Sequence, residues 1–322
     1  MRYTLAPVFA VIAVLVLGAC SGGSSSDDGG LDKIKIGVIP IADVAPLYLA
    51  REKGIFAEHG LEVEFAEAAG GAALIPAVVS GDYDYAFSNL VSLAVATSKG
   101  LPLKVVAAGA SSTGIPGADF GAVMTKPDSA INEPVDLVGR RIAVNALSSV
   151  NEMLVKERVE QDGGDASKVQ FVELPHSDMP AALDRGDVDA IWEVEPFLTS
   201  IRAGGAKEVW SLYAEAFPDL TVATYFTTAQ RIASDSDQVR RFYDALIEAY
   251  AYANEHDAEV RAALSQYTSI DPATASAIVL PAWPSAINTA SVQFQLDTAQ
   301  KWNLIGDGDV NLDGLIAEGG TQ

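Results

Sequence analysis

The chain has 322 residues, with 43 Asp and Glu against 21 Lys and Arg, so its formal net charge is −22. Hydrophobic residues make up 49% and charged residues 20%, which is too apolar for a disordered chain and too charged for a protein with many membrane spans. The acidic excess argues against nucleic acid as a partner, because phosphate backbones are bound by clustered Lys and Arg. At about 100–200 residues per domain, the length predicts two domains.

The N-terminal residues have the pattern of an export signal. Arg2 precedes an almost wholly apolar stretch at residues 5–17, which is shorter than the about 20 apolar residues of a membrane span. We therefore predict a signal peptide at residues 1–19. The closing residues Leu17-Gly18-Ala19-Cys20 resemble a bacterial lipobox, which implies lipidation of Cys20 at the mature N-terminus.

The residues around Cys20 carry two further predictions. Cys20 is the single cysteine, which excludes an intrachain disulfide and any site built on several thiolates. Residues 21–30 contain only Ser, Gly and Asp, a composition that cannot pack a core. Residues 20–32 are therefore predicted to be the lipidated cysteine and a flexible tether.

The body of the chain repeats one plan. Three predicted strands recur in the same order at an offset of 105 or 106 residues, which predicts two lobes of like topology. The strand pairs are 34–38 with 140–144, 61–65 with 168–171, and 81–87 with 186–192.

Predicted helices separate these strands. They lie at residues 46–59, 72–79, 149–161 and 179–184. Strands that alternate with helices predict an α/β fold, in which each lobe is a mostly parallel sheet flanked by helices. The C-terminal third predicts helices without clear strands, which we expect to pack around the lobes. These helices lie at 236–255, 257–266, 272–279 and 291–301.

Ligands of α/β sheets bind beyond the carboxyl ends of the strands. The repeat therefore places six candidate loops around a cleft that can close by a hinge. These loops are 40–45, 66–72, 88–89, 145–150, 173–178 and 193–196. None of them contains Lys or Arg, which argues against a bidentate clamp on a highly charged anion.

Acidic and aromatic side chains in these loops suggest a ligand chemistry. Asp43, Glu193 and Glu195 would favour a ligand with an amine or ring N–H donors. Glu195 precedes a proline at a strand end, so it could instead bind backbone across the hinge. Trp192 could stack on a planar ligand or belong to the core.

Two predicted helix starts could bind an anion through their free N–H groups. They are Gly70-Gly71 and Ser148-Ser149. Each has an equally good local explanation, which is a tight turn for the glycines and a helix cap for the serines.

The histidines show no spacing typical of a metal site, and no nucleophile elbow accompanies them. We expect His59 to cap a helix end, His256 to lie at the surface and His176 to be a rim residue of the cleft rather than a ligand contact. The sequence therefore predicts no metal, no cofactor and no catalytic residue.

The segment 309–314 matches the first half of a calcium loop, with Asp309, Asn311 and Asp313 at the ligand positions. The twelfth position is Gly320, where an acidic ligand is needed. We read this segment as a turn-rich tail, and calcium binding there stays open.

Several stretches together resemble the nitrate, sulfonate and taurine solute-binding protein family, which also holds thiamine-pyrimidine-binding proteins. They are 37–40, 45–56, 80–84, 99–102, 136–142 and 182–190, followed by Glu195-Pro196. The resemblance implies a two-lobed type II periplasmic-binding fold that serves an ABC importer. It implies lobe I at residues 33–115 plus 226–322 and lobe II at 116–225.

The resemblance also implies the site and the partners. Together with the acidic residues, the implied ligand-binding set is Ile41, Ala42, Asp43, Ser88, Asn89, Leu147, Ser148, Ser149, Trp192, Glu193, Glu195 and Tyr225. The expected protein is a monomer, bound to the outer face of the cytoplasmic membrane by its lipid alone, that delivers its ligand to a permease and its ATPase. The ligand would be a taurine-like sulfonate or a nitrogen heterocycle such as the thiamine pyrimidine.

Two other functions fit the same fold. Some relatives are thiamine-pyrimidine synthases that carry pyridoxal phosphate and a cysteine-rich motif, whereas this chain has one cysteine in its lipobox. A surface receptor that senses a ligand through the same cleft is the other alternative.

Overall fold

The computed structural model describes residues 30–306 and 310–317. The predicted signal peptide, Cys20 and the tether up to residue 29 therefore lie outside the described residues, as do Asp309 and Gly320 of the calcium-like segment. Within the described ranges, none of the helices is long and apolar enough to cross a membrane.

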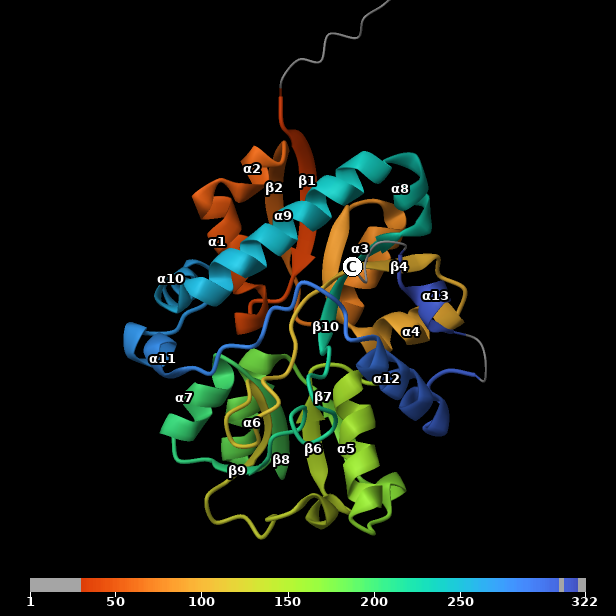
Figure 1. The fold of residues 1–322 in the computed structure, drawn as a ribbon. Helices are drawn as coiled ribbons and strands as arrows, with labels where there is room; N and C mark the ends of the chain where they lie inside the picture. The colour runs from red at the N-terminus through yellow and green to blue at the C-terminus, as the bar shows by residue number, and fades with distance from the viewer. Residues whose placement is uncertain (1–29, 307–309, 318–322) are drawn as a thin grey trace, which may run out of the picture. The chain divides into compact units, whose positions relative to one another are not determined.

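The strands form two five-stranded sheets, with the orders β2-β1-β3-β10-β4 and β7-β6-β8-β5-β9 (Figure 1). We call the first sheet with its helices lobe I and the second lobe II. The strands of lobe I are β1 (Asp32–Val38), β2 (Leu61–Glu67), β3 (Tyr85–Asn89), β4 (Leu103–Ala108) and β10 (Ala223–Thr228). Those of lobe II are β5 (Gly121–Thr125), β6 (Arg141–Val144), β7 (Gln170–Glu173), β8 (Ala190–Val194) and β9 (Lys207–Trp210).

The helices follow the strands in chain order. The α-helices are α1 (Ala45–Lys53), α2 (Ile55–Glu58), α3 (Gly71–Ser80), α4 (Leu90–Ser98), α5 (Val150–Gln161), α6 (Met179–Arg185), α7 (Phe197–Ala203), α8 (Ala229–Ser234), α9 (Ser236–Glu255), α10 (Asp257–Ala263), α11 (Pro272–Ala277), α12 (Thr289–Lys301) and α13 (Leu312–Leu315). Five 3-10 turns are η1 (Ala42–Val44), η2 (Pro134–Leu137), η3 (Ala166–Lys168), η4 (His176–Asp178) and η5 (Leu264–Gln266).

The predicted repeat is confirmed in the pairing of the strands. In lobe I, β1 pairs in parallel with both β2 and β3, and in lobe II β6 pairs in parallel with both β7 and β8. An aspartate after each Gly-Asp turn has the same role in both lobes. The Asp84 carboxylate accepts the N–H of Lys35 at 2.6 Å, and the Asp189 carboxylate accepts that of Arg141 at 2.8 Å.

One strand of each sheet runs against its neighbours in the described fold, and the sequence did not predict it. β10 pairs antiparallel with β3 and β4, while β5 pairs antiparallel with β8 and β9. β10 returns from lobe II, so the chain crosses between the lobes before it begins. Since β10 begins at Ala223, the sheet of lobe I includes residues that the predicted boundary at residue 226 assigned to lobe II.

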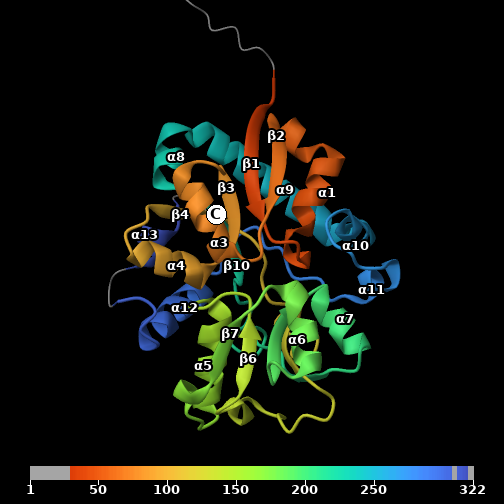
Figure 2. The same ribbon diagram turned by 180° about the vertical axis from the view of Figure 1, so that it is seen from behind.

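Helices cover both faces of the lobe I sheet. α9 runs across one face in Figure 1, and α3 lies on the opposite face, in front in Figure 2. The predicted helix 46–59 is two helices, because Gly54 adopts φ +81° and ends α1 in the left-handed conformation. The predicted helix 236–255 has the bounds of α9.

The segments that join the lobes form a small ladder. Ser111 bridges both Thr221 and Ala282, and its N–H and C=O are bonded to Ala282 at 2.9 and 3.0 Å. Beside this ladder, the fully buried Asp119 carboxylate accepts the Ser112 hydroxyl at 2.7 Å and the Thr113 N–H at 3.0 Å. Asp119 therefore fixes the backbone of the first crossing.

We expect Asp119→Ala to lower the free energy of unfolding by about 2–4 kcal/mol, because the buried donors of Ser112 and Thr113 would lose a charged acceptor. Chemical denaturation measures this loss. The control is Asp187→Ala, which removes a carboxylate that is 56% exposed and pairs with the exposed Arg185. Equal stabilities of the two variants would contradict a structural role for Asp119.

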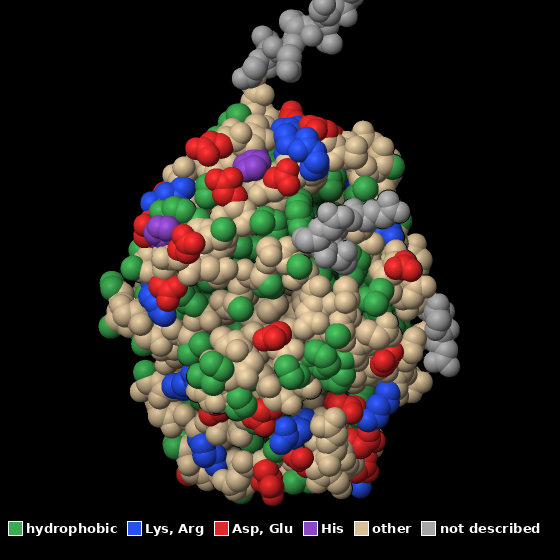
Figure 3. All heavy atoms as spheres, in the orientation of Figure 1, with side chains coloured by type: hydrophobic (Ala, Val, Ile, Leu, Met, Phe, Trp, Pro, Cys, Tyr) green, Lys and Arg blue, Asp and Glu red, His purple; other side chains and the backbone are tan. Residues whose placement is uncertain are grey.

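On the face shown in Figure 3, Lys and Arg side chains lie scattered among Asp and Glu side chains. Several basic groups of the described chain are paired locally, such as Arg240 with Asp237 and Asp244, and Arg158 with Asp162. Such exposed pairs contribute little to stability.

Candidate functional site

The loops at the carboxyl ends of the two sets of parallel strands meet each other. The Ala42 N–H of lobe I donates to the Glu195 carbonyl of lobe II at 2.9 Å. The Val150 N–H of lobe II lies 3.4 Å from the Asn89 side-chain oxygen of lobe I. The predicted cleft loops therefore face each other, and the lobes are closed along this line.

Six buried polar atoms at these loops and strand ends share one property: each finds no hydrogen-bond partner among the described residues. They are Asp43 Oδ2, Ser88 Oγ and Thr224 Oγ1 from lobe I, and His176 Nε2, Trp192 Nε1 and Glu193 Oε1 from lobe II. An unpaired buried polar atom costs about 1–3 kcal/mol, so such a group of atoms is rare without a function. Four of the six residues, Asp43, Ser88, Trp192 and Glu193, belong to the predicted site.

Asp43 is the acidic centre on the lobe I side. It lies in η1 directly after β1 and is 3% exposed. Burial raises the pKa of Asp43 from 3.8 to about 7, although the nearby His176 acts in the opposite direction. A carboxyl with this pKa can accept a hydrogen bond when ionised and donate one when protonated.

His176 and Glu193 form a buried pair on the lobe II side. His176 Nδ1 lies 2.7 Å from Glu193 Oε2, and the two side chains are 4% and 0% exposed. Burial raises the pKa of Glu193. With Glu193 ionised and the imidazole neutral, Nδ1–H donates to Glu193 and Nε2, which is buried without a partner, is an acceptor.

The prediction that His176 is a rim residue was wrong. Its loop was a candidate, but no local residue pattern indicates that Glu193 at the end of β8 pairs with it. The two residues are brought together because β7 and β8 both flank β6, so their carboxyl ends lie at one edge of the sheet.

Aromatic rings surround the pair. The His176 ring lies 5.4 Å from the Trp192 ring and is stacked on Phe197 at 5.7 Å. Trp192 is 3% exposed and meets the Tyr213 ring edge-on at 5.8 Å. Trp192 is thus buried, as the core interpretation requires, while its unpaired N–H faces no protein acceptor. Tyr213, which the sequence analysis missed, lies in a segment without regular structure.

A groove of about 270 Å³ opens beside His176 of this cluster. It is lined by Ile39, Pro40, Ile41, Glu67, Ala68, Ala69, Pro175, His176, Ser177 and Phe197. None of these lining residues is Lys or Arg, and both lobes contribute to them. The groove has the size of a small organic molecule.

The Ser88 and Thr224 hydroxyls belong to facing residues of β3 and β10, which place them on one face of the sheet. The start of α3 lies directly against them, since a Cβ on Gly71 would come within 2.4 Å of Ser88 Oγ. Because Gly71 has no Cβ, α3 can approach β3 this closely. The Gly70-Gly71 pair thus serves close packing in the structure.

Two backbone donors that precede α5 are bonded within the protein. The N–H of Ser148 donates to Glu152 at 2.8 Å, and that of Leu147 donates to Glu173 at 3.0 Å. Ser149 is fully buried and its hydroxyl donates to the Ala146 carbonyl at 2.7 Å. These backbone donors are therefore not free for a sulfonate or nitrate oxygen, and the Leu147 side chain is 45% exposed.

Two other predicted contacts are engaged within the protein. Both Glu195 carboxylate oxygens bind Thr199, and one of them also accepts the Val279 N–H at 3.2 Å. Glu195 thus binds backbone of the C-terminal third, as the alternative interpretation proposed. Asn89 caps α4 by accepting the Ser92 N–H at 2.9 Å.

Tyr225 points into the core of lobe I. Its ring contacts those of Phe87 and Phe242 edge-on at 5.4 and 6.1 Å, and it is 1% exposed. Tyr225 is therefore part of the core that supports the site, and its side chain has almost no exposed surface. Ile41 and Ala42, by contrast, lie at the interface of the lobes, and Ile41 lines the groove.

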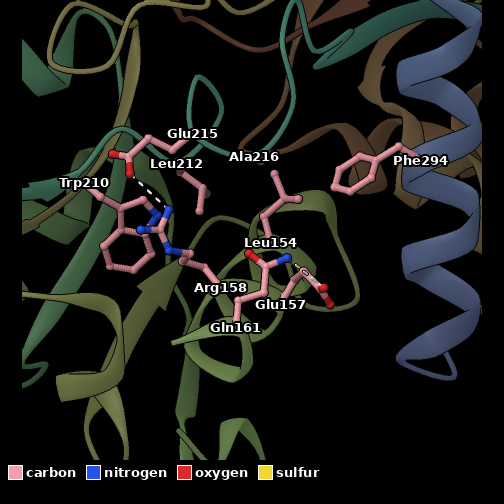
Figure 4. Close-up of a pocket in the computed structure, with 9 residues that line it drawn as sticks. All are labelled: Leu154, Glu157, Arg158, Gln161, Trp210, Leu212, Glu215, Ala216 and Phe294. Carbon is pink, nitrogen blue, oxygen red and sulfur yellow. Dashed lines mark hydrogen bonds and ion pairs between the residues drawn. The ribbon is translucent and has the colours of Figure 1, made fainter. Parts of the chain in front are cut away.

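A second hollow, shown in Figure 4, lies between α5, the segment after β9 and Phe294 of α12. Its cavity volume of about 20 Å³ holds about one water molecule. Its polar groups are paired with one another. Arg158 is bonded to Glu215 at 3.0 Å, and the Gln161 side-chain amide donates a hydrogen bond to Glu157 at 3.0 Å. It is too small for an organic ligand.

Metal-ligating side chains do not gather in the described part of the chain: His, Cys, Asp and Glu form no group of three or more there that could hold a metal ion. In the calcium-like segment, the Asn311 side chain caps α13 by accepting the Gly314 N–H at 2.7 Å. The other two histidines lie at helix ends, where His59 is bonded to Glu248 and His256 to the Tyr252 carbonyl.

Solved structures show which class of protein has this fold. The ligand-binding component of an ABC-type import system from Staphylococcus aureus superposes with a TM-score of 0.76 at 16% identity, over 89% of this chain and 96% of that one. The fold is therefore that of the two-lobed periplasmic binding proteins. Residues 41–260 match the family described as NMT1/THI5 like, and the chain belongs to that family.

Two curated relatives are similar in sequence. The formylaminopyrimidine-binding protein of Halalkalibacterium halodurans is 30% identical over 183 residues, which are 56% of this chain and 53% of that protein. The taurine-binding periplasmic protein of Escherichia coli is 30% identical over 161 residues, 50% of this chain and 48% of that protein. The matched regions thus span about half the length of these relatives.

Proposed function

We propose that this protein is the extracytoplasmic solute-binding component of an ABC importer and that it encloses a small solute rich in N–H donors between its lobes. One observation carries the proposal. Unpaired, buried polar atoms from both lobes lie at the loops and strand ends along which the lobes face each other, and Asp43 of lobe I lies close enough to His176 of lobe II to interact with it electrostatically. A bound solute would supply the missing partners.

Binding requires the lobes to separate first. The six atoms are buried away from solvent in the closed form, so a solute reaches them only through an open one. The crossings at Ser111, Thr221 and Ala282 are the segments about which the lobes would move. Closure over the solute then replaces water with fixed partners, and reopening at the permease releases it.

The chemistry of the cluster favours nitrogen heterocycles with amino groups. Asp43, Glu193 and His176 offer acceptors, Trp192 offers an N–H donor, and the aromatic rings offer flat apolar walls. An amino-pyrimidine presents N–H donors, ring-nitrogen acceptors and a planar face, which match these groups. Nitrate or an alkanesulfonate would place an anion beside the carboxyl groups of Asp43 and Glu193, and the groove that opens beside His176 is not lined by Lys or Arg.

The proposed location is the outer face of the cytoplasmic membrane, with Cys20 as the lipid anchor. The support is the apolar stretch before Cys20 and the Ser-Gly-Asp tether after it. Cell fractionation tests this part: Cys20→Ser should move the protein from the membrane fraction to the soluble exported fraction. Unchanged membrane association would overturn the lipid anchor.

We expect formylaminopyrimidine to raise the unfolding temperature of the purified protein, because a ligand that binds only the folded state stabilises it by about 2.7 kcal/mol at a hundred times its Kd. A panel with taurine, an alkanesulfonate, nitrate and bicarbonate tests the ligand class by thermal shift and calorimetry. Glu193→Gln should weaken binding at least about tenfold, a difference of 1.4 kcal/mol. The control Glu62→Gln changes a carboxylate that is 57% exposed and should leave binding unchanged. A response to nitrate or alkanesulfonate alone would contradict the proposed chemistry.

A further inference from the structure

Residues 279–283, which we call the strap, touch both sides of the candidate site and the hinge. The strap lies between α11 and α12 in the chain. Its Val279 N–H donates to the Glu195 carboxylate of lobe II. Its Ala282 exchanges two backbone hydrogen bonds with Ser111 of the first crossing, at 2.9 and 3.0 Å. The strap is thus positioned to respond to the relative placement of the lobes.

Trp283 joins the strap to the acidic centre. Its indole N–H donates to the Asp43 backbone carbonyl at 2.8 Å, and the side chain is 3% exposed. The backbone of Trp283 is held in turn by the Asn254 side chain at 2.9 Å. The hydrogen bond between Trp283 and Asp43 joins residues 240 positions apart in the chain, and neither the repeat nor the position of the loops predicts it.

The Asp43 loop has few other anchors. The Ala42 N–H is bonded to the Glu195 carbonyl of the opposite lobe. This hydrogen bond would break when the lobes separate. Tyr267 donates its hydroxyl to the Ile41 carbonyl at 3.1 Å, one residue further back. Trp283 is therefore the side chain that holds the backbone of Asp43 itself within lobe I, while Asp43 Oδ2 is left without a partner.

We propose that Trp283 is a positioning residue for the Asp43 carboxylate. It holds this carboxylate at its position in the cleft, and it links that position to the hinge through the strap. Its effect on ligand affinity rests on the proposed function. Its effect on the ionisation of Asp43 does not, because that is a property of the ligand-free protein.

The first test is an NMR titration of the Asp43 side-chain carboxyl in the full chain, with Asp43→Asn to assign the signal. The groups that face Asp43 are His176 and Asp119, with the phenols of Tyr213, Tyr225 and Tyr267 nearby. Trp283→Phe should lower the pKa of Asp43 by about one unit or more, because a freed loop lets the carboxylate reach water. The matched control is Trp302→Phe, which removes an indole N–H bonded to Glu157 at 3.0 Å and should leave this titration unchanged.

The second test is the affinity for formylaminopyrimidine. Trp283→Phe should weaken it about tenfold, and the same substitution should have no further effect in the Asp43→Asn background. Should Trp283→Phe fail to fold, benzothienylalanine at position 283 removes the N–H while keeping the shape of the ring system. An Asp43 titration that is the same in wild type, Trp283→Phe and Trp302→Phe would overturn the proposal. A wild type that does not bind this probe would instead count against the proposed ligand, and the titration would still decide the role of Trp283.

Discussion

Replacing Asp43 by Asn should weaken ligand binding strongly and yet make the ligand-free protein harder to unfold. The buried Asp43 carboxyl has an oxygen without a hydrogen-bond partner, and burying such a group destabilises the folded state. Asn keeps the shape and removes the charge. We expect binding to weaken by about a hundredfold or more, since a charged hydrogen bond to the solute and its placement are lost together.

The pH dependence of this gain follows from the pKa. Burial raises the pKa of Asp43 from 3.8 to about 7, so the folded state binds the proton more tightly than the unfolded state. This group therefore destabilises the fold progressively as pH rises from about 4 to about 7, by on the order of 4 kcal/mol at most. The difference in unfolding free energy between Asp43→Asn and wild type should grow across that window and level off above it.

Urea denaturation of both proteins between pH 4 and pH 8 measures this difference. Glu193 and Glu195, whose pKa values burial also raises, are present in both proteins and cancel in the comparison. A difference that stays constant with pH would show that Asp43 keeps an ordinary pKa and is not the buried acidic centre.

Trp192→Ala should remove both ligand binding and a large part of the stability of lobe II. The truncation leaves a cavity beside His176 and Tyr213, which costs about 3–5 kcal/mol for a buried aromatic side chain. Trp192→Phe fills most of that space and removes the indole N–H. We expect it to keep most of the stability while weakening binding at least about tenfold.

Trp210→Ala is the matched control for this pair of variants. Trp210 is 4% exposed and lies on β9, where it pairs with Val123, which also pairs with Trp192 on β8. The control should lose similar stability but keep the ligand response, as judged by thermal shift. If Trp210→Ala and Trp192→Ala lost ligand binding equally, a general weakening of lobe II would explain both.

The sequence was sufficient to predict the parallel half of each sheet. β1, β2 and β3 and their counterparts β6, β7 and β8 carry local signals, such as apolar runs, Gly-Asp turns and a recurring offset. The reversed strands β5 and β10 are short apolar stretches without the Gly-Asp turn or the recurring offset, and each is paired with strands that come from distant parts of the chain. Long-range pairing of this kind depends on the crossings between the lobes rather than on local residue patterns.

The site was predictable to the extent that it lies at strand ends. Asp43, Ser88, Trp192 and Glu193 follow from the rule that ligands bind at the carboxyl edge of such sheets. The rule does not say which loop groups are already satisfied, and so it also selected Ser148 and Glu195. It missed Trp283 and Tyr213, which lie in segments without regular structure and reach the cleft only through tertiary packing.

A crystal structure of the protein with the solute that gives the largest thermal shift would show whether the solute binds between the lobes. We expect the solute between the lobes, with its polar atoms within hydrogen-bond distance of Asp43 Oδ2, His176 Nε2 and Glu193 Oε1. All three atoms would then have partners that they lack in the ligand-free protein. A solute bound elsewhere, with these atoms still unpaired, would contradict the assignment of the site.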